Sequence, residues 1–101
     1  MISIPADRIA AIRARRDEMQ ALMATGDLSA ERFVATSKEY AEIEPVAQAA
    51  EAVQALRDEI AGLEAILVDA GSDPEMRDMA REELDGVKTQ LTDAERALGL
   101  R

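Results

Sequence analysis

The 101-residue chain contains no cysteine and no histidine. Without cysteine it can form no disulfide and carry out no thiolate chemistry, and without either residue the usual zinc sites are excluded. Disulfides are rare in the cytosol, so the absence of cysteine suits a cytoplasmic protein, and that is the location we expect.

Aromatic residues and long uncharged runs are also scarce. Tryptophan is absent, and the only aromatic residues are Phe33 and Tyr40. The core must therefore consist of Ile, Leu, Val, Met and many alanines. Alanine lets helices approach closely but buries little area, so we expect an elongated bundle of modest stability. No uncharged run approaches the roughly 20 residues of a membrane-spanning helix, so no membrane partner is predicted.

The first helix is predicted over about residues 5–25. Ser3 or a neighbour can cap it, Pro5 suits its start, and Gly26 is a natural stop. Apolar side chains recur at helical spacing and form a stripe along this segment. The stripe consists of Ile9, Ile12, Met19, Leu22 and Met23.

The second helix is predicted over residues 30–68, with Ser29 as its N-cap. Pro45 lies inside this segment. Because proline cannot donate a backbone hydrogen bond and disfavours helical geometry at the preceding residue, we expect a kink or short break there. Beyond it, apolar residues alternate by three and four, as in a coiled-coil seam. The seam consists of Val46, Ala49, Val53, Leu56, Ile60, Leu63 and Leu67.

The third helix is predicted over residues 74–98. Asp73 can cap it with Pro74 in the first helical position, or Ser72 and Glu75 can form a capping box. Its seam consists of Ala80, Leu84, Val87, Leu91, Ala94 and Leu98. We expect the apolar residues near its start, including Met76 and Met79, to seal the end of a helical hairpin.

These elements predict an all-α fold in a single domain over residues 1–101. The short polar turn at 69–72 makes the second and third helices antiparallel neighbours. The architecture is then an elongated antiparallel helical hairpin with a coiled-coil-like seam and a packed N-terminal helix, which together form a three-helix bundle. Gly62 and Gly86 lie inside the helices, where they either permit close packing or are simply tolerated.

The net charge of −9 is unevenly distributed along the chain. Residues 1–38 carry six basic and five acidic side chains, whereas residues 39–101 carry six basic and sixteen acidic ones. Because an acidic surface repels phosphate, most of the chain is not expected to bind nucleic acid directly. Such a surface could complement a basic protein, or it could be an ordinary solvated helix surface.

No arrangement of residues predicts catalysis. The neighbouring acids Glu82, Glu83 and Asp85 point in different directions on a helix, so a solvent-facing surface is a better interpretation than a metal site. Ser37 and Tyr40 have no partner base at a recognisable spacing, and no glycine-rich phosphate loop occurs. We therefore expect no enzymatic activity, no metal and no cofactor.

Two segments carry a family resemblance. The stretch Asp73 to Leu84 reads DPEMRDMAREEL, and Glu31 to Val46 reads ERFVATSKEYAEIEPV. In this order and spacing, the first stretch resembles the third helix and the second stretch the second helix of the N-terminal domain of bacterial peptide chain release factor 1. Members of that family are class-one release factors that read UAA and UAG. The resemblance covers essentially the whole chain, although neither motif is a catalytic signature.

The resemblance implies a ribosome-docking domain in translation termination. In that family the first domain reaches the base of the ribosomal stalk near protein L11, and it has been linked to the GTPase release factor. Codon reading and the Gly-Gly-Gln loop belong to later domains, and neither a Gly-Gly-Gln sequence nor a codon-reading Pro-x-Thr tripeptide occurs here. We therefore expect an N-terminal domain alone. The alternative is a stand-alone helical hairpin that serves as a structural or adaptor protein.

The first helix holds the only concentration of basic residues. Arg8 and Arg15 share a face, and Arg13 can pair with Asp17 four residues later. Arg8, Arg13 and Arg15 are candidate contacts to ribosomal RNA or to an acidic partner, but ordinary ion pairing is the simpler interpretation and the one we prefer. Arg16 falls on the apolar stripe, where we expect it to snorkel or to pair with a glutamate of a neighbouring helix.

Overall fold

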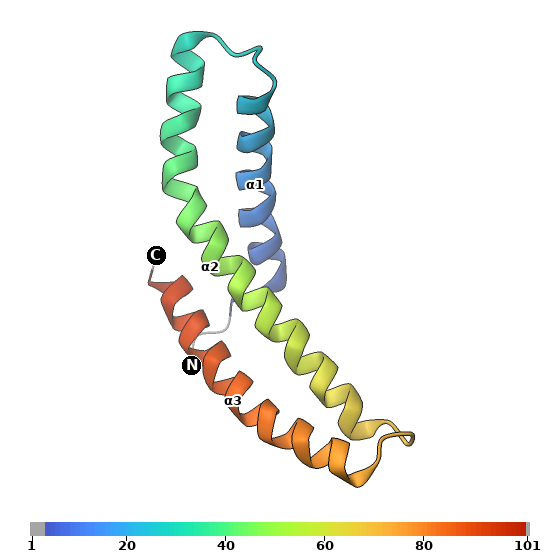
Figure 1. The fold of residues 1–101 in the computed structure, drawn as a ribbon. Coiled ribbons are helices and arrows are strands. Elements are labelled where there is room, and N and C mark those ends of the chain that lie inside the picture. The colour runs from blue at the N-terminus through green and yellow to red at the C-terminus, as the bar shows by residue number, and fades with distance from the viewer. Residues whose placement is uncertain (1–3, 101) are drawn as a thin grey trace.

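The computed structural model describes residues 4–100, which contain three α-helices and no strand. The helices are α1 (Ala6–Ala24), α2 (Ala30–Val68) and α3 (Pro74–Gly99). α1 lies along the first part of α2 and α3 along the last part, and both run antiparallel to it (Figure 1). The predicted all-α class with an antiparallel hairpin is confirmed.

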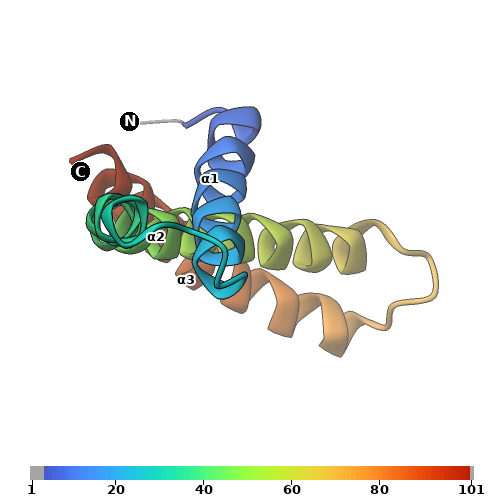
Figure 2. The same ribbon diagram turned by 90° about the horizontal axis from the view of Figure 1, so that it is seen from above.

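The molecule is a rod whose three helices meet only at its middle. Its principal extents are 61 × 28 × 18 Å. α1 begins and α3 ends near the middle of the rod, so each end of the rod contains only one pair of helices (Figure 1). Seen from above, α1 is inclined to α2 rather than strictly parallel to it (Figure 2).

The helix boundaries follow from local capping. The Ser29 hydroxyl accepts a hydrogen bond from the Arg32 backbone N–H at 3.2 Å, and the Asp73 carboxylate accepts one from the Met76 backbone N–H at 2.8 Å. Asp73 is therefore the cap of α3. Gly26 has a φ of 75°, the left-handed conformation that ends helices and that glycine adopts without strain.

At the start of α1 the cap position is Pro5, which has no side-chain hydrogen bond. The predicted cap Ser3 lies outside the described residues. The described part of α1 therefore begins without the side-chain cap that stabilises the starts of α2 and α3.

Pro45 does not interrupt α2, which is helical from Ala30 to Val68. The predicted short break is therefore not formed. Instead, the axis of α2 changes direction near its middle, in the green part of the ribbon (Figure 1). A proline inside a helix removes one backbone hydrogen bond and bends the axis. Pro45 is exposed and its neighbour Ala47 is fully buried, so the helix continues with its packed face intact.

The core consists of two apolar clusters along α2. The central cluster contains side chains from all three helices, including the fully buried Ile9 and Val53 together with Leu98. The distal cluster joins α2 to α3 near the hairpin turn, around Leu63 and Leu84. Every residue of both predicted seams belongs to one of these clusters. The heptad seam of α2 therefore packs against the other two helices of the same chain.

The two glycines inside the helices are tolerated rather than required. A Cβ atom placed on Gly62 or on Gly86 would meet no atom within 4 Å apart from the helix's own backbone and adjacent residues. Neither position therefore allows a close approach of helices that alanine would prevent.

Candidate functional site

The predicted contact residues Arg8, Arg13 and Arg15 are all exposed on α1. The Arg15 guanidinium lies 2.9 Å from the Glu39 carboxylate on α2 and 3.3 Å from that of Glu18 on its own helix. These ion pairs partly neutralise Arg15. Within residues 4–100, Arg8 and Arg13 form no ion pair.

The predicted pair between Arg13 and Asp17 is not formed. Asp17 instead accepts a hydrogen bond from Arg16 Nε at 2.6 Å. Adjacent residues on a helix point in different directions, but the long arginine side chain can fold back to its neighbour. Arg13 is therefore left with an exposed guanidinium that the described chain does not neutralise by direct pairing.

Arg16 is the centre of the largest ionic network between α1 and α2. Its side chain is 13% exposed, as expected from its position on the apolar stripe. It donates from Nη1 to Glu44 at 3.2 Å and from Nη2 to Glu51. The two glutamates are seven residues apart and so lie on one face of α2. The expectation that Arg16 pairs with glutamates of a neighbouring helix is confirmed.

These contacts shift ionisation equilibria in the network. The hydrogen bond to Glu51, followed by that to Asp17, raises the pKa of Arg16 above its usual value. The neighbouring Tyr40 hydroxyl lowers the pKa of Glu44, and Glu44 in turn raises the pKa of Tyr40. All three shifts stabilise the form that is present at neutral pH, so the network is a structural element rather than a proton-transfer site.

A second buried ionic contact fastens the start of the described chain to the hairpin. Arg57 Nη2 donates to the Ile4 carbonyl oxygen at 2.6 Å and to Glu95 Oε2 at 3.0 Å. The Glu95 side chain is only 8% exposed. Arg57 thereby connects the segment before α1 with both α2 and α3, next to the central cluster.

The hairpin end differs from the sequence expectation. Ala80 and Leu84 are buried as predicted, but Met76 is 47% exposed and Met79 is 64% exposed. The two methionines therefore do not seal the hairpin, and the expectation that they would was wrong. They lie beside a hollow of about 190 Å³ between α2 and α3. The hollow is lined by Leu63, Ile66, Met76, Met79, Ala80 and Glu83.

A second hollow, of about 250 Å³, lies between α1 and α2. It is lined by Arg15, Met19, Glu39, Glu42 and Ile43. The Arg15–Glu39 ion pair crosses from one wall to the other, so opposite charges are already paired inside it.

Neither a metal centre nor a membrane span is present in the described part of the chain. No group of three or more acidic side chains there is placed to hold a metal ion. No helix within residues 4–100 combines the length and the apolar character needed to cross a membrane.

Several interacting residues were not singled out from the sequence. The sequence alone does not show that ionic partners exist for Glu44, Glu51, Arg57 and Glu95. The groups they contact are 28 to 53 residues away, so these contacts follow only from the register between the helices. The one available signal was the position of Glu95 between seam residues, where a charged group must find a partner.

Comparison with known proteins gives a consistent result. The PCRF domain model matches residues 12–100. A protein of Zymomonas mobilis named "Peptide chain release factor 1" is 57% identical over 100 residues, which are 99% of this chain and 27% of the relative. Proteins of the same name from Erythrobacter litoralis and Novosphingobium aromaticivorans are 46% and 40% identical, each over 98% of this chain and 27% of the relative.

The chain thus spans 27% of the length of these relatives. No solved structure gave a significant match to the chain.

Proposed function

This chain belongs to the peptide chain release factor 1 family, and from that premise we propose that it is the N-terminal, ribosome-docking domain of a factor that directs translation termination at UAA and UAG codons. The observation that carries the proposal is the similarity to release factor 1 proteins along nearly the whole chain. The helical rod suits a docking arm, because it presents long surfaces.

In this proposal the chain itself is not an enzyme. Codon reading and the promotion of peptidyl-tRNA hydrolysis belong to other domains of the factor, since the sequence contains no Gly-Gly-Gln and no Pro-x-Thr tripeptide. The docking domain holds those domains in place on the ribosome. The factor acts in the cytoplasm, where the ribosome is found.

The proposed partner is the base of the ribosomal stalk, in the region of protein L11, with the GTPase release factor as a further partner. Charge supports a protein contact for most of the surface, because residues 39–101 carry ten more acidic than basic side chains and so repel phosphate. The exception is α1, where Arg8 and Arg13 are exposed and unpaired in the described chain and could meet ribosomal RNA. Arg15 is a weaker candidate because Glu39 already engages it.

The alternative of a self-associating hairpin adaptor loses its main support. A self-associating adaptor would use the heptad seam of α2 as an exposed face for another helix. In the structure that seam packs against α1 and α3 of the same chain, so it needs no second copy.

A domain exchange tests the docking role. The matching segment of the Zymomonas mobilis relative would be deleted, or replaced by this chain, and the factors would be compared by co-sedimentation with ribosomes that carry a UAA codon. We expect the deletion to weaken binding and the exchange to restore it. Equal binding by the intact and deleted factors would contradict a docking role.

The proposal that this chain is one domain of a longer release factor has a separate test. Reading the coding sequence beyond codon 101 should reveal a frame that encodes a Gly-Gly-Gln loop. A stop codon directly after Arg101 would instead favour a free-standing helical protein, and the adaptor interpretation would then lead.

A further inference from the structure

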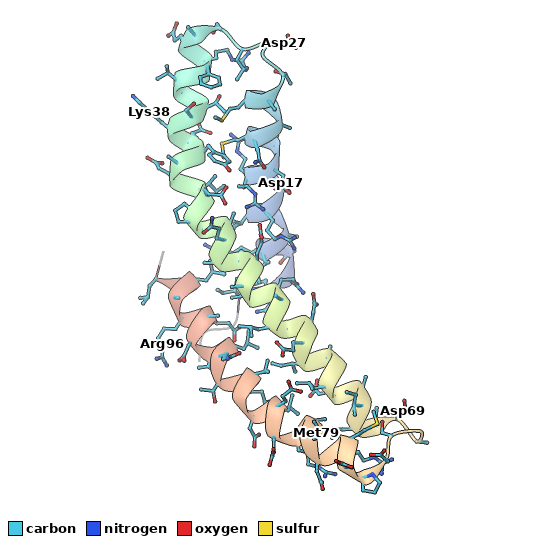
Figure 3. The ribbon with its side chains drawn as sticks, viewed as in Figure 1. Asp17, Asp27, Lys38, Asp69, Met79 and Arg96 are labelled. Carbon is cyan, nitrogen blue, oxygen red and sulfur yellow. The ribbon has the colours of Figure 1, made fainter. Side chains whose placement is uncertain are left out.

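The end of the α2–α3 hairpin carries an apolar groove that the described chain leaves unfilled. We call it the tip groove, and it is the hollow of about 190 Å³ described above. The side chains of Met76 and Met79 form its α3 wall, and those of Leu63 and Ile66 form its α2 wall. Figure 3 shows Met79 on α3 close to the turn that contains Asp69. The groove is therefore at the far end of the rod, away from α1.

The exposure of this end is not explained by folding. Met79 is 64% exposed and Met76 is 47% exposed, and both line the groove. Scattered apolar residues are normal on a surface, but a contiguous apolar patch beside a groove marks an interaction site. Methionine suits such a site because its flexible and polarisable side chain adapts to the shape of a partner.

The size of the groove favours side chains over a small molecule. Pockets for drug-sized ligands usually have volumes of about 300–1,000 Å³. The tip groove is smaller and opens to the surface, so it can receive one or two apolar side chains of a larger partner. A helix that presents apolar residues three or four positions apart provides such side chains.

Charge selects the partner. Residues 58–85 contain ten acidic and only two basic side chains. Both basic residues are engaged locally, because Arg77 donates to the Asp69 carbonyl oxygen at 3.2 Å and Arg81 pairs with Asp78 at 3.0 Å. The segment that carries the groove therefore has a net charge of −8, and the acidic Glu83 lies in the groove lining itself. A second copy of this chain and a nucleic acid are both repelled by such a surface.

We propose that the tip groove binds a basic amphipathic helix of a partner protein. Apolar side chains of that helix enter between Met76 and Met79 of α3 and Leu63 and Ile66 of α2, and flanking Lys or Arg side chains face the acidic rim that includes Glu83. This inference rests on the proposed docking function and deepens it, because it assigns the docking surface and the chemistry of the protein that meets it.

The test uses the 101-residue chain and a synthetic helical peptide with leucines on one face and lysines on the other. Binding would be measured by isothermal titration calorimetry for the unaltered chain, for Met79→Gln and for the double variant with Met76→Gln. We expect the double variant to bind at least about tenfold more weakly, as for loss of an apolar anchor. Both positions are exposed, so circular dichroism should show an unchanged fold.

Val34→Gln provides the matched control. Val34 is 53% exposed on α2, close to the opposite end of the rod, so this variant should bind the peptide as the unaltered chain does. A peptide of the same composition in scrambled order should bind weakly, since it keeps the charge but loses the apolar face. Equal binding of both peptides, or no effect of the double variant, would mean that charge alone attracts the peptide and would overturn the proposal.

Two other outcomes would also overturn it. Tight binding of a duplex RNA would make nucleic acid the occupant, and concentration-dependent dimerisation lost in the double variant would make a second copy the occupant. The same double variant placed in the exchanged factor separates this inference from the docking role. If that factor binds ribosomes as tightly as the exchanged factor without the two substitutions, the tip groove is not the docking surface. The proposed docking role of the domain would still hold in that case.

Discussion

At the scale of single residues, the α1–α2 interface depends on one guanidinium that meets carboxylates from both helices. Arg16 contacts Asp17, Glu44 and Glu51 while its side chain is almost covered. Ion pairs on a protein surface contribute little, but a cation held between several carboxylates also prevents their mutual repulsion. The ordered position of α1 therefore depends on this residue more than on the exposed arginines around it.

Replacement of Arg16 by methionine should lower the stability of the chain. The variant keeps much of the aliphatic stem but leaves Glu44 and Glu51 facing each other without a cation, so the urea midpoint measured by circular dichroism should fall. Arg13→Met is the matched control. Arg13 is exposed and forms no ion pair in residues 4–100, so its replacement should change stability by no more than about 0.5 kcal/mol. Similar losses in both variants would show that only net charge matters.

The single tyrosine gives a direct reading of the same network. Glu44 raises the pKa of Tyr40, so the tyrosinate absorption should appear at higher pH than in an unfolded peptide. In Glu44→Gln this pKa should return towards its ordinary value of about 10. The exposed Glu42→Gln is the control and should leave the titration unchanged. A titration curve that is the same in all three proteins would contradict the contact.

The direction of the shift also fixes how this contact affects stability. The folded chain holds the Tyr40 proton more tightly than the unfolded chain does. The contribution of this contact to the free energy of unfolding is therefore complete below the ordinary tyrosine pKa, and it is lost as the pH rises through the raised pKa of Tyr40. At neutral pH the contact stabilises the fold fully.

At the scale of helices, sequence pattern predicts most of the fold because the seams are regular. Apolar residues spaced by three and four must face one side of a helix, and a short turn leaves the next helix as the nearest cover. Pro45 shows where local rules stop. The loss of a backbone hydrogen bond at this proline is predictable from the sequence. Whether α2 breaks or bends there depends on the packing of Ala47 and Ala50, which are both fully buried, and local sequence rules do not describe that packing.

The glycines inside helices provide a test at the same scale. Gly62→Ala and Gly86→Ala should each stabilise the chain by about 0.5–1 kcal/mol, since alanine is the better helix former and the added methyl group meets nothing. Gly26→Ala should destabilise it, because the φ of 75° strains any residue with a Cβ atom. Urea unfolding of the three variants measures both the expected gains and the expected loss in the free energy of unfolding. Destabilisation at Gly62 or Gly86 would contradict the open space around these two positions.

At the scale of the whole molecule, the rod shape follows from the placement of α1 and α3 on successive parts of α2. The Cα radius of gyration is 18.4 Å, whereas a compact domain of this length would have one of about 13 Å. Small-angle X-ray scattering from a dilute solution should therefore give a value close to that of the rod. A value near that of the compact domain would mean that α1 folds back onto the hairpin.

The candidate contacts were harder to predict than the fold. The charge imbalance of residues 39–101 can be read from the sequence, and so can the exposed arginines of α1. The tip groove could not, because the apolar residues near the start of α3, including Met76 and Met79, were expected to seal the end of the hairpin. Both methionines remain exposed beside the hollow, although Leu63 and Ile66 of α2 form its other wall.

The central cluster, where all three helices meet, separates two arms that share one helix. Sites that are far apart and have no common partner respond to substitution almost independently. Each end of the rod can therefore change its surface without disturbing the other. One end can diverge to suit a new partner while the other keeps its own, and both remain joined through the same few buried residues at the middle.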